Sequence, residues 1–329
     1  MKQPMKLFAP LTALLGLSVL TALTAYYGFA PVGRAVASVG WGAGLVILTR
    51  VLELIGAGLG WGLLVKGAVV RQPLVFIGLR FIREAINTLF PVAQVGGDLI
   101  GGRLATYFGV AGGVAFASVL IDVFVQVATL LGFVLGGVGI LLLVTDDHGL
   151  ATALSWGLVA AVPAIGGFFV VLRVGPSNAN IARFAAFAER RGWGALDHVK
   201  RLGESLRAIW GRPGALWASA IVHLSIWWLG ALEVWIALTF MGHPVTLADA
   251  AAIESVGQAV RAAAFAMPGG LGIQDGGLIA VCGLFGISAE VALAVALVKR
   301  IAELALGIPG LIAWQALEGR KLLSSRGGP

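Results

Sequence analysis

Charged residues are scarce in this sequence, and their scarcity excludes a whole class of proteins. Asp, Glu, Lys and Arg together make up 12% of the 329 residues, whereas 59% are hydrophobic. A soluble domain carries roughly a quarter charged residues, so this chain is not one. The mean hydropathy of +0.95 indicates instead a protein whose surface faces lipid.

Cysteine and histidine are nearly absent as well. The single cysteine, Cys282, has no partner for an internal disulfide, and its apolar neighbours favour a small core residue. The four histidines are scattered without metal-ligand spacing, so we expect neither a metal nor another cofactor. His223 lies in a long apolar run and is expected to be a hydrogen-bonded core residue.

Basic residues outnumber acidic residues, 23 to 16, which gives a net charge of +7. In a membrane protein this excess is attributed to cytoplasmic loops and to affinity for anionic head groups. We therefore expect membrane lipids as partners and no nucleic acid.

Long apolar runs predict membrane-spanning helices, each of which needs ~20 apolar residues. Two further apolar intervals, 74–110 and 247–286, are interrupted near their middles by Gly, Pro and charged residues and do not fit one clean helix. A cleaved signal peptide is the alternative for the first run. The six predicted spans are residues 7–29, 39–65, 113–144, 150–172, 214–241 and 288–316.

Lysines and arginines in short loops predict which side of the membrane each loop faces. They place both termini, the loop around Lys66 and the basic segment 173–213 in the cytoplasm. Apolar residues at helical spacing within 173–213 predict a helix on the membrane surface. The loop assignments agree if 74–110 and 247–286 are re-entrant hairpins, and the alternative is two extra full spans in each interval.

The two interrupted intervals share a motif. "FPVAQVGGD" and "MPGGLGIQD" each place a proline seven residues before an aspartate, Pro91 before Asp98 and Pro268 before Asp275, with glycines between them. The order helix, helix, hairpin, helix also occurs twice. Because the hairpins start from opposite sides, this order predicts an inverted-topology repeat, which in transporters places substrate at broken helices near the midplane. Ordinary Pro/Gly turns at the membrane surface are the alternative.

The predicted fold is an all-α polytopic membrane protein with about six transmembrane helices and two re-entrant broken-helix hairpins, arranged as an inverted-topology repeat. Residues 1–149 form the first membrane repeat, and residues 150–316 form the second. Residues 317–329 form a cytoplasmic tail. Assembly into a homo-oligomer is left open.

Charged residues also lie inside the apolar runs, where each costs ~2.5–3.5 kcal/mol at a helix centre on insertion scales. They must therefore pair with one another or face water. Mutual neutralisation that locks helices together is one interpretation. The pairs predicted from helical spacing are Arg50 with Glu53, Arg80 with Glu84, and Glu303 with Lys299 or Arg300.

The other interpretation is a basic cavity that binds an anionic head group, because guanidinium groups match phosphate in bidentate geometry. In that cavity five arginines converge, while Asp98, Glu254 and Asp275 balance the charge or carry protons. The predicted substrate-pathway residues, most of which lie near the two broken-helix motifs, are Arg80, Arg83, Glu84, Asn87, Pro91, Asp98, Arg103, Glu254, Gln258, Arg261, Pro268, Asp275 and Arg300.

Three stretches resemble the integral-membrane family typified by the flippase portion of lysylphosphatidylglycerol synthases. They are "NTLFPVAQVGGDLIGGRLATYFGV", "MPGGLGIQDGGLIAVCGLFGISAEVALAVALVKRIAEL" and the closing "PGLIAW". Among subgroups, the chain is most similar to the hopanoid-biosynthesis-associated membrane protein. The doubled glycine before Asp98 departs from the family pattern, which needs one. The matching residues are Asn87, Pro91, Gly97, Asp98, Arg103, Pro268, Gly270, Gly272, Asp275, Gly286, Ala292 and Arg300.

The resemblance implies a flippase or transporter in the bacterial inner membrane that moves an amphiphilic lipid between leaflets through a central polar cavity. A hopanoid and an anionic or aminoacylated phospholipid are the lipids considered. Bifunctional members of the family also carry a soluble aminoacyl-transferase domain, whereas this chain stops shortly after its last predicted span, so we expect no enzyme activity. Two alternatives stay open. One is a membrane-embedded enzyme acting on a lipid-linked substrate, with "TDDH" at 145–148 as its candidate motif. The other is a scaffold or accessory subunit for lipid-biosynthesis enzymes.

Overall fold

The computed structural model describes residues 18, 21–22, 24–66, 72–90, 96–144, 149, 152, 163, 166–171, 173, 196–263 and 272–326. The regular elements in these ranges are all α-helices, as the sequence predicts. In chain order they are α2 (Phe29–Ser38), α3 (Gly42–Leu64), α5 (Pro73–Leu89), α6 (Gly96–Tyr107), α7 (Gly112–Val144), α10 (Leu196–Trp210), α11 (Pro213–Phe240), α12 (Leu247–Ala263), α13 (Ile273–Leu284) and α14 (Ala289–Arg326).

Three of these helices are long and apolar enough to cross a membrane, judged by length and composition within the described residues. They are α3, α7 and α11, and their ends lie within three residues of the predicted spans 39–65, 113–144 and 214–241. Helix α14 begins where the predicted span 288–316 begins but continues as a helix to Arg326. The predicted spans 7–29 and 150–172 lie mostly outside the described residues, so a total of six spans stays a prediction.

Each interrupted interval contains a helix of 17 residues followed by a helix of 12 residues. In the first interval these are α5 and α6, and in the second they are α12 and α13. Pro91 and Pro268, in the stretches that join them, lie outside the described residues. A 12-residue helix is about 18 Å long, which is too short to cross the ~30 Å hydrocarbon core of a bilayer.

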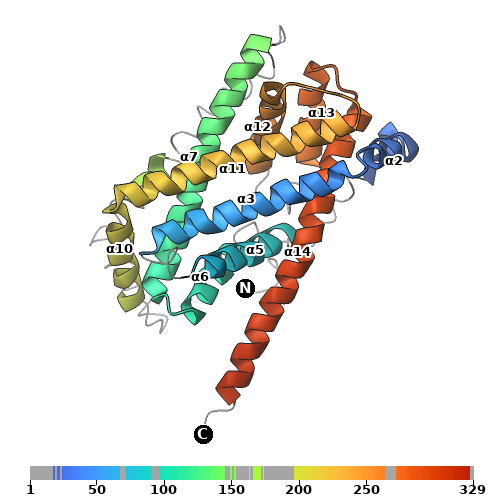
Figure 1. The fold of residues 1–329 in the computed structure, drawn as a ribbon. Coiled ribbons are helices and arrows are strands. Elements are labelled where there is room, and N and C mark those ends of the chain that lie inside the picture. Colours follow the sequence, from blue (N-terminus) through green and yellow to red (C-terminus); the bar gives the residue numbers. More distant parts are fainter. Residues whose placement is uncertain are drawn as a thin grey trace, which may run out of the picture.

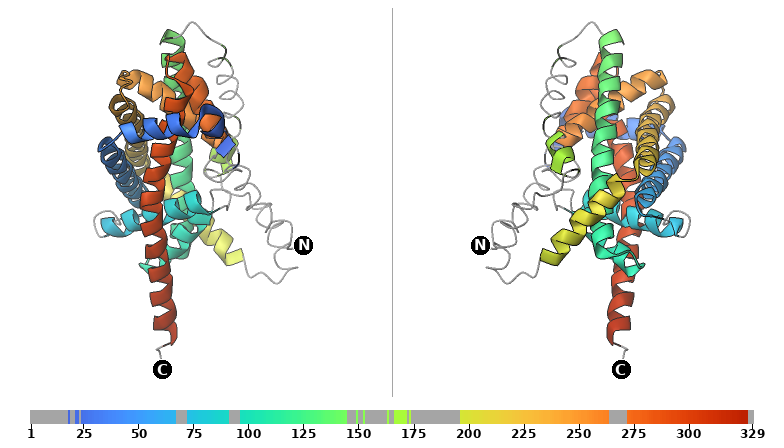
Figure 2. Two further views of the ribbon diagram at one scale, coloured as in Figure 1. Left: turned by 90° about the vertical axis from the view of Figure 1, so that its right-hand side faces the viewer. Right: turned by 90° about the vertical axis from the view of Figure 1, so that its left-hand side faces the viewer.

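The helices pack in pairs that have counterparts in the two parts of the chain. Helices α3 and α11 lie side by side, and α7 and α14 run steeply across them (Figure 1). Helix α5 packs against α14 and α6, while α12 packs against α7 and α13. At the periphery α2 contacts α14 and α10 contacts α7. Figure 2 shows the same two long helices, α7 and α14, standing upright in both side views.

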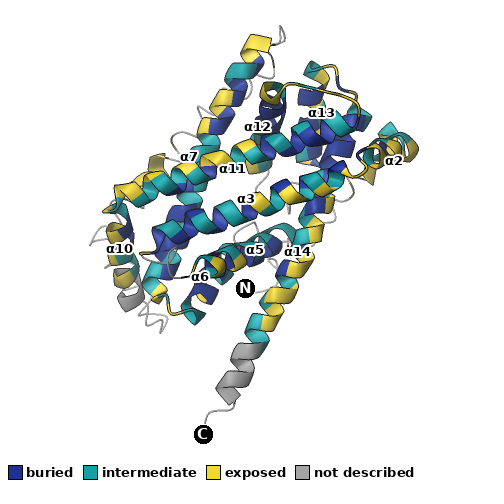
Figure 3. Cartoon of the chain, viewed as in Figure 1, coloured by how far each residue is buried: buried dark blue, intermediate teal, exposed yellow. Residues whose placement is uncertain are grey.

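Helix α11 shows that the molecule is built with its apolar surface outward. Trp217, Ile221 and Trp228 are exposed along one side, whereas His223 and Glu233 are buried on the other. A soluble helix has the reverse pattern, so this one requires lipid around it. Figure 3 shows the same arrangement more widely, with buried residues gathered where α3, α11, α12 and α13 meet and exposed residues on the outer faces.

Two short helices differ from the sequence-based expectation. Residues 30–38 lie between the predicted spans 7–29 and 39–65, but with Phe29 they form α2. The basic segment 173–213 contains α10, whereas the apolar residues that predicted a surface helix, Ile181 to Trp193, lie outside the described residues. The division into repeats 1–149 and 150–316 stays a prediction.

Candidate functional site, a buried polar cavity

A cavity of about 250 Å³ lies between α3, α5, α6, α7, α11 and α12. On the three candidate spans its lining residues fall near the middle of each helix, for example Glu53 on α3, Val127 on α7 and Ile226 on α11. Such positions lie at the depth of the hydrocarbon core when these helices cross a membrane. The polar lining residues are Arg50, Glu53, Arg80, Glu84, Asn87, Thr88, Asp98, Gln126, His223, Gln258 and Arg261.

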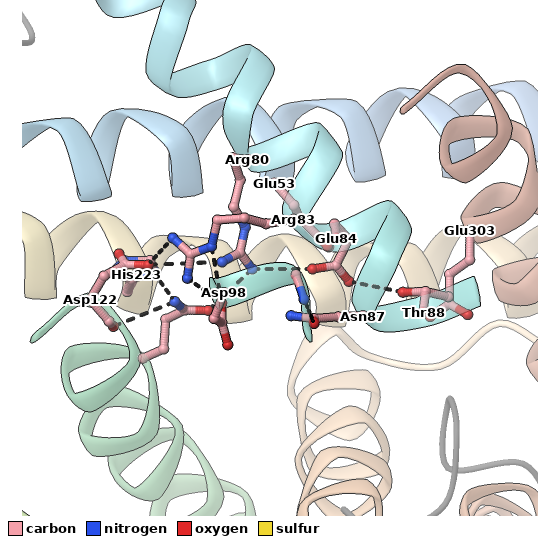
Figure 4. Close-up of polar contacts among 12 residues, drawn as sticks. Glu53, Arg80, Arg83, Glu84, Asn87, Thr88, Asp98, Asp122, His223 and Glu303 are labelled. Atoms are coloured by element: carbon pink, nitrogen blue, oxygen red, sulfur yellow. Dashed lines mark hydrogen bonds and ion pairs between the residues drawn. The ribbon is translucent and has the colours of Figure 1, made fainter. Parts of the chain in front are cut away.

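Arg83 is fully buried behind the cavity wall and binds acidic residues of two neighbouring helices. Its Nε and Nη2 donate to Asp98 Oδ1 of α6 at 3.0 and 2.6 Å, and its Nη1 donates to Asp122 Oδ2 of α7 at 2.9 Å. The guanidinium carbon also lies 4.6 Å from the ring centroid of Trp61 on α3, a cation–π contact. Arg83 therefore ties α3, α6 and α7 to α5 (Figure 4).

Arg83, Asp98 and Asp122 form a first cluster, and Asp122 extends it to α11. His223 Nε2 lies 3.0 Å from Asp122 Oδ1, and both side chains are buried, which confirms His223 as a hydrogen-bonded core residue. Gln126, one turn further along α7, donates from Nε2 to Asp122 Oδ2 at 2.8 Å and accepts from Arg80 Nη2 at 3.2 Å. Each oxygen of the buried Asp122 carboxylate thus has a hydrogen-bonding partner, as buried polar groups require.

A second cluster surrounds α14. Arg300 Nη2 donates to both carboxylate oxygens of Asp275 on α13, at 2.8 and 3.0 Å. Lys299 Nζ donates to Glu254 Oε2 on α12 at 2.6 Å and lies 3.4 Å from Glu233 Oε2 on α11. The charges of α14 therefore hold α11, α12 and α13 together.

Arg50 on α3 joins the two clusters. Its Nη1 donates to Glu53 Oε2 at 2.7 Å, and its Nη2 donates to Glu84 Oε1 of α5 at 3.2 Å. The same Nη2 lies 3.5 Å from Glu303 Oε1 of α14, which also accepts from Arg261 Nη1 of α12 at 2.9 Å. One guanidinium thus lies at the meeting point of three helices.

The aspartates of the two sequence motifs occupy equivalent places. Asp98 and Asp275 each lie in the first turn of a 12-residue helix, where the helix dipole stabilises an acid. Each accepts from a buried or mostly buried arginine, Asp98 from Arg83 and Asp275 from Arg300. Asp275 Oδ2 also accepts the backbone N–H of Gly272 at 2.8 Å. The motifs therefore place an acid where it both begins a helix and binds an arginine.

The glycine directly before Asp98 has a structural explanation. The backbone N–H of Gly97 donates to Asn87 Oδ1 at 2.7 Å. A Cβ atom at Gly97 would collide with the backbone carbonyl oxygen of Arg83, and a Cβ atom at Gly101 would lie 2.5 Å from Arg83 Cδ. Glycine at these two positions therefore lets α6 approach α5 closely enough for Asp98 to reach Arg83.

A substitution at Gly97 tests this close approach. Gly97→Ala is expected to destabilise the protein by about 1–3 kcal/mol, because the backbone of α5 cannot move aside as a flexible side chain does. The measurement is thermal unfolding in mild detergent. Gly132→Ala on α7 is the matched control, since no atom lies within 4 Å of its Cβ position. Equal melting temperatures for the two variants would contradict the explanation.

Several predicted pathway residues lie together at the cavity, and others lie behind its wall. Arg83, Glu254, Asp275 and Arg300 belong to the buried ion-pair network but are not among the residues that line the cavity. The predicted residues that line the cavity are Arg80, Glu84, Asn87, Asp98, Gln258 and Arg261.

Arg103 lies apart from this group. Its side chain is 58% exposed, and it pairs with Glu318 of α14 at 3.1 Å and donates to Tyr107 at 2.7 Å. It therefore does not converge with the other arginines. Pro91 and Pro268 lie outside the described residues.

The predicted local ion pairs have different outcomes. Arg50 with Glu53 and Arg80 with Glu84 are confirmed, at 2.7 and 3.2 Å. The predicted pair of Glu303 with Lys299 or Arg300 is wrong, because Glu303 binds Arg261 and Arg50 from other helices. The two basic residues of α14 bind carboxylates on α11, α12 and α13 instead.

The network does not have the surplus of positive charge expected of a basic cavity. In the described part of the chain each of its arginines is bound by a carboxylate, and eight carboxylates share six basic side chains. The carboxylates are Glu53, Glu84, Asp98, Asp122, Glu233, Glu254, Asp275 and Glu303, and the basic side chains are those of Arg50, Arg80, Arg83, Arg261, Lys299 and Arg300.

Sequence reasoning left several site residues out of the predicted pathway. The charged ones were visible as charges within apolar runs, but they were assigned to local pairs or to no role. Gln126 and Thr88 gave no signal, because an uncharged polar side chain in an apolar helix commonly bonds its own backbone. The omitted residues of the cavity and network are Arg50, Glu53, Thr88, Asp122, Gln126, His223, Glu233, Lys299 and Glu303.

Comparison with known proteins gives one match. The family model described as "Lysylphosphatidylglycerol synthase TM region" matches residues 11–310, which include every described residue that lines the cavity. No curated protein matches the chain, and no solved structure matches it.

Proposed function

The chain belongs to the lysylphosphatidylglycerol synthase transmembrane-region family, whose members are membrane proteins related to lipid handling, and from this premise we propose that it moves an amphiphilic lipid between the two leaflets of a membrane. The observation that carries the proposal is the polar cavity near the middle of α3, α7 and α11. An intramembrane cavity lined by ionisable residues is the usual mark of a substrate pathway.

The size of the cavity limits which part of a lipid can enter it. At about 250 Å³ the cavity is at or below the lower end of the ~300–1,000 Å³ typical of pockets that bury a whole drug-sized ligand. It is therefore better matched to a phosphate or amine head group than to a whole lipid. We therefore propose that the head group passes through the cavity while the chains stay in the bilayer, where they need no polar partner.

The lining supports a head group that carries charged or strongly polar groups. Arg50, Arg80 and Arg261 offer guanidinium donors suited to phosphate, while Glu53 and Glu84 offer acceptors suited to an amine. A head group in the cavity exchanges partners with these side chains instead of losing its hydration without compensation. An anionic or aminoacylated phospholipid fits this lining, and the hopanoid-associated subgroup stays a prediction.

The proposal includes an inverted-topology repeat with two re-entrant hairpins, six spans, and both termini in the cytoplasm of a bacterial cell. The paired contacts of α5 with α14 and of α12 with α7 support the repeat. The 12-residue lengths of α6 and α13 support re-entrance, since neither helix crosses a bilayer alone. Cysteine labelling at Val92 and Gly269 tests this topology, with slow labelling from opposite sides expected.

Lipid exchange in reconstituted vesicles tests the function. Purified protein in liposomes with fluorescent phospholipids, anionic and aminoacylated ones in turn, is expected to bring the label of the inner leaflet within reach of an external quencher. Arg261→Ala is expected to slow this exchange roughly 10- to 100-fold, because a hydrogen bond to a charged group contributes about 1.5–3 kcal/mol.

Arg103→Ala is the matched control, since this arginine is exposed and lies apart from the cavity. It is expected to exchange lipid at the wild-type rate. If the wild-type protein accelerates exchange of no lipid class, the proposal fails. Chemical turnover of the lipid in the same vesicles would point to the alternative, a membrane-embedded enzyme acting on a lipid-linked substrate.

A further inference from the structure

We infer that Glu53 and Glu233 form a proton-binding site that couples lipid movement to a proton gradient. The inference rests on the proposed function and adds its energy source. Glu53 lies on α3 and Glu233 on α11, the two helices that pack side by side through the centre of the molecule (Figure 1). Both residues are buried, at 5% and 1% exposure.

The first observation is the charge of the network. It holds eight carboxylates against six permanently or normally cationic side chains in the described part of the chain. His223 is bound by Asp122 and forms no ion pair with Glu53 or Glu233 in the described part of the chain. An uncompensated charge in the low-dielectric interior is costly, so a buried surplus of acids is relieved most simply by bound protons.

The second observation singles out these two acids. Glu53 Oε1 and Glu233 Oε1 are buried and have no hydrogen-bond partner among the described residues. The other six carboxylates of the network have no oxygen in that condition. A buried carboxylate oxygen without a donor carries the full desolvation cost of that atom. A proton on one carboxyl group supplies the missing donor and removes one negative charge.

The surroundings of the pair are strongly charged on every side. Glu53 and Glu233 repel each other, and Arg50 and Lys299 attract both of them. Glu254 on α12 repels both of them as well. Glu84 on α5, Glu303 on α14 and Arg261 on α12 lie further out, around Arg50. Two cations thus face three acids at the pair itself.

The step itself is a simple protonation. In the empty cavity an O–H bond is present on one of the two carboxyl groups. When a head group that carries an ammonium group binds, that bond breaks, the proton passes to water, and both electrons stay on the carboxylate, which then accepts hydrogen bonds from the ammonium group. Glu53 lines the cavity and Glu233 does not, so Glu53 is the member that meets the head group and the water.

Infrared difference spectroscopy tests the proton directly, without any transport assay. Deuterated and non-deuterated samples of the wild-type protein near neutral pH are expected to differ in the C=O stretch of a protonated carboxylic acid. Glu233→Gln is expected to abolish that band, and Glu53→Gln provides a second variant should the first fail to fold. Glu290→Gln, at a partly exposed acid in the first turn of α14 that forms no ion pair of the network, is the control that keeps the band.

A pH gradient across the vesicles tests the coupling. One pH unit is worth 1.36 kcal/mol per proton, so a gradient of one unit is expected to shift the distribution of the labelled lipid between leaflets by up to about tenfold in the wild type. Glu233→Gln is expected to reduce this ratio to about one, while Glu290→Gln retains it. The measured quantity is the final ratio of labelled lipid between the two leaflets. A variant that only slows exchange therefore does not change it.

The outcomes separate the inference from the proposed function. Wild-type protein that exchanges lipid but shows neither the carboxylic acid band nor a gradient-dependent ratio overturns the proton site and leaves the transport proposal intact. A band and a ratio that both persist in Glu233→Gln and Glu53→Gln also overturn it. Absence of lipid exchange in the wild type, with the band present, overturns the transport proposal and the coupling but leaves the proton-binding site itself.

Discussion

Replacing Arg83 with alanine is expected to destabilise the protein by about 3–5 kcal/mol and to abolish lipid exchange, because it removes the nearest cation from the buried Asp122 and the partly buried Asp98. Arg83 is fully buried and binds Asp98 and Asp122 together. Asp98 keeps no other ion pair within the described residues, and Asp122 keeps mainly His223 and Gln126. The expected fall in melting temperature is roughly 6–10 °C in mild detergent.

Two further variants show which property of Arg83 matters. Arg83→Lys retains the charge but loses the bidentate geometry and the contact with Trp61, so an intermediate loss is expected. Arg103→Ala removes an exposed arginine from the same region and is expected to cost no more than about 1 kcal/mol. If Arg83→Ala melted as Arg103→Ala does, the buried network would not be a source of stability.

Much of the fold was predictable because apolar length and interruption are local properties of a sequence. The spans at α3, α7 and α11, the start of α14 and the two-helix form of both interrupted intervals all follow from them. The 10-residue helix α2 was missed, because its sequence contains Pro31, Gly33 and Arg34 and reads as a connection between spans. The far end of α14 was missed because its composition becomes polar and is no longer that of a span.

The site was predictable as a set of residues but not as a set of contacts. Charges within apolar runs must be compensated, so most members of the network were recognisable from sequence. Their partners were not, because the decisive pairs join distant helices: Arg50 with Glu84, Arg83 with Asp122, and Lys299 with Glu254. Helical spacing correctly predicted the pairs Arg50–Glu53 and Arg80–Glu84. It failed for Glu303, because Glu303 binds arginines on other helices instead of a basic residue on its own helix.

The network contains both acidic and basic side chains, and this changes how tightly the cavity is expected to bind a head group. A cavity lined by free arginines would bind an anionic head group tightly and release it slowly. Here each arginine already has a carboxylate, so a head group must displace one side chain from another, and part of the binding energy is spent in breaking that pair. A pathway needs such moderate binding, since a substrate that crosses a membrane must leave as well as bind.

Arg50 is the residue that joins the two clusters, and Arg50→Met is expected to abolish lipid exchange, as Arg83→Ala is. Its guanidinium binds Glu53 of its own helix, Glu84 of α5 and Glu303 of α14. The substitution keeps an unbranched side chain in place but leaves three carboxylates facing one another. The expected loss of stability is again about 3–5 kcal/mol, since a buried ion pair is broken from one side.

A double substitution separates the loss of charge balance from the loss of the link between helices. Arg50→Met with Glu84→Gln removes one cation and one anion, so thermal unfolding is expected to recover by at least about 1 kcal/mol relative to Arg50→Met alone. Lipid exchange in vesicles is expected to stay at least tenfold below wild type, because the contacts between α3, α5 and α14 at this point are still absent. Arg34→Met, at an exposed arginine on α2, serves as the control with wild-type melting and exchange. Exchange that returned in step with stability would mean that Arg50 acts only by balancing charge, whereas exchange that stays low in a stable protein would make Arg50 the connection through which α5 and α14 move together.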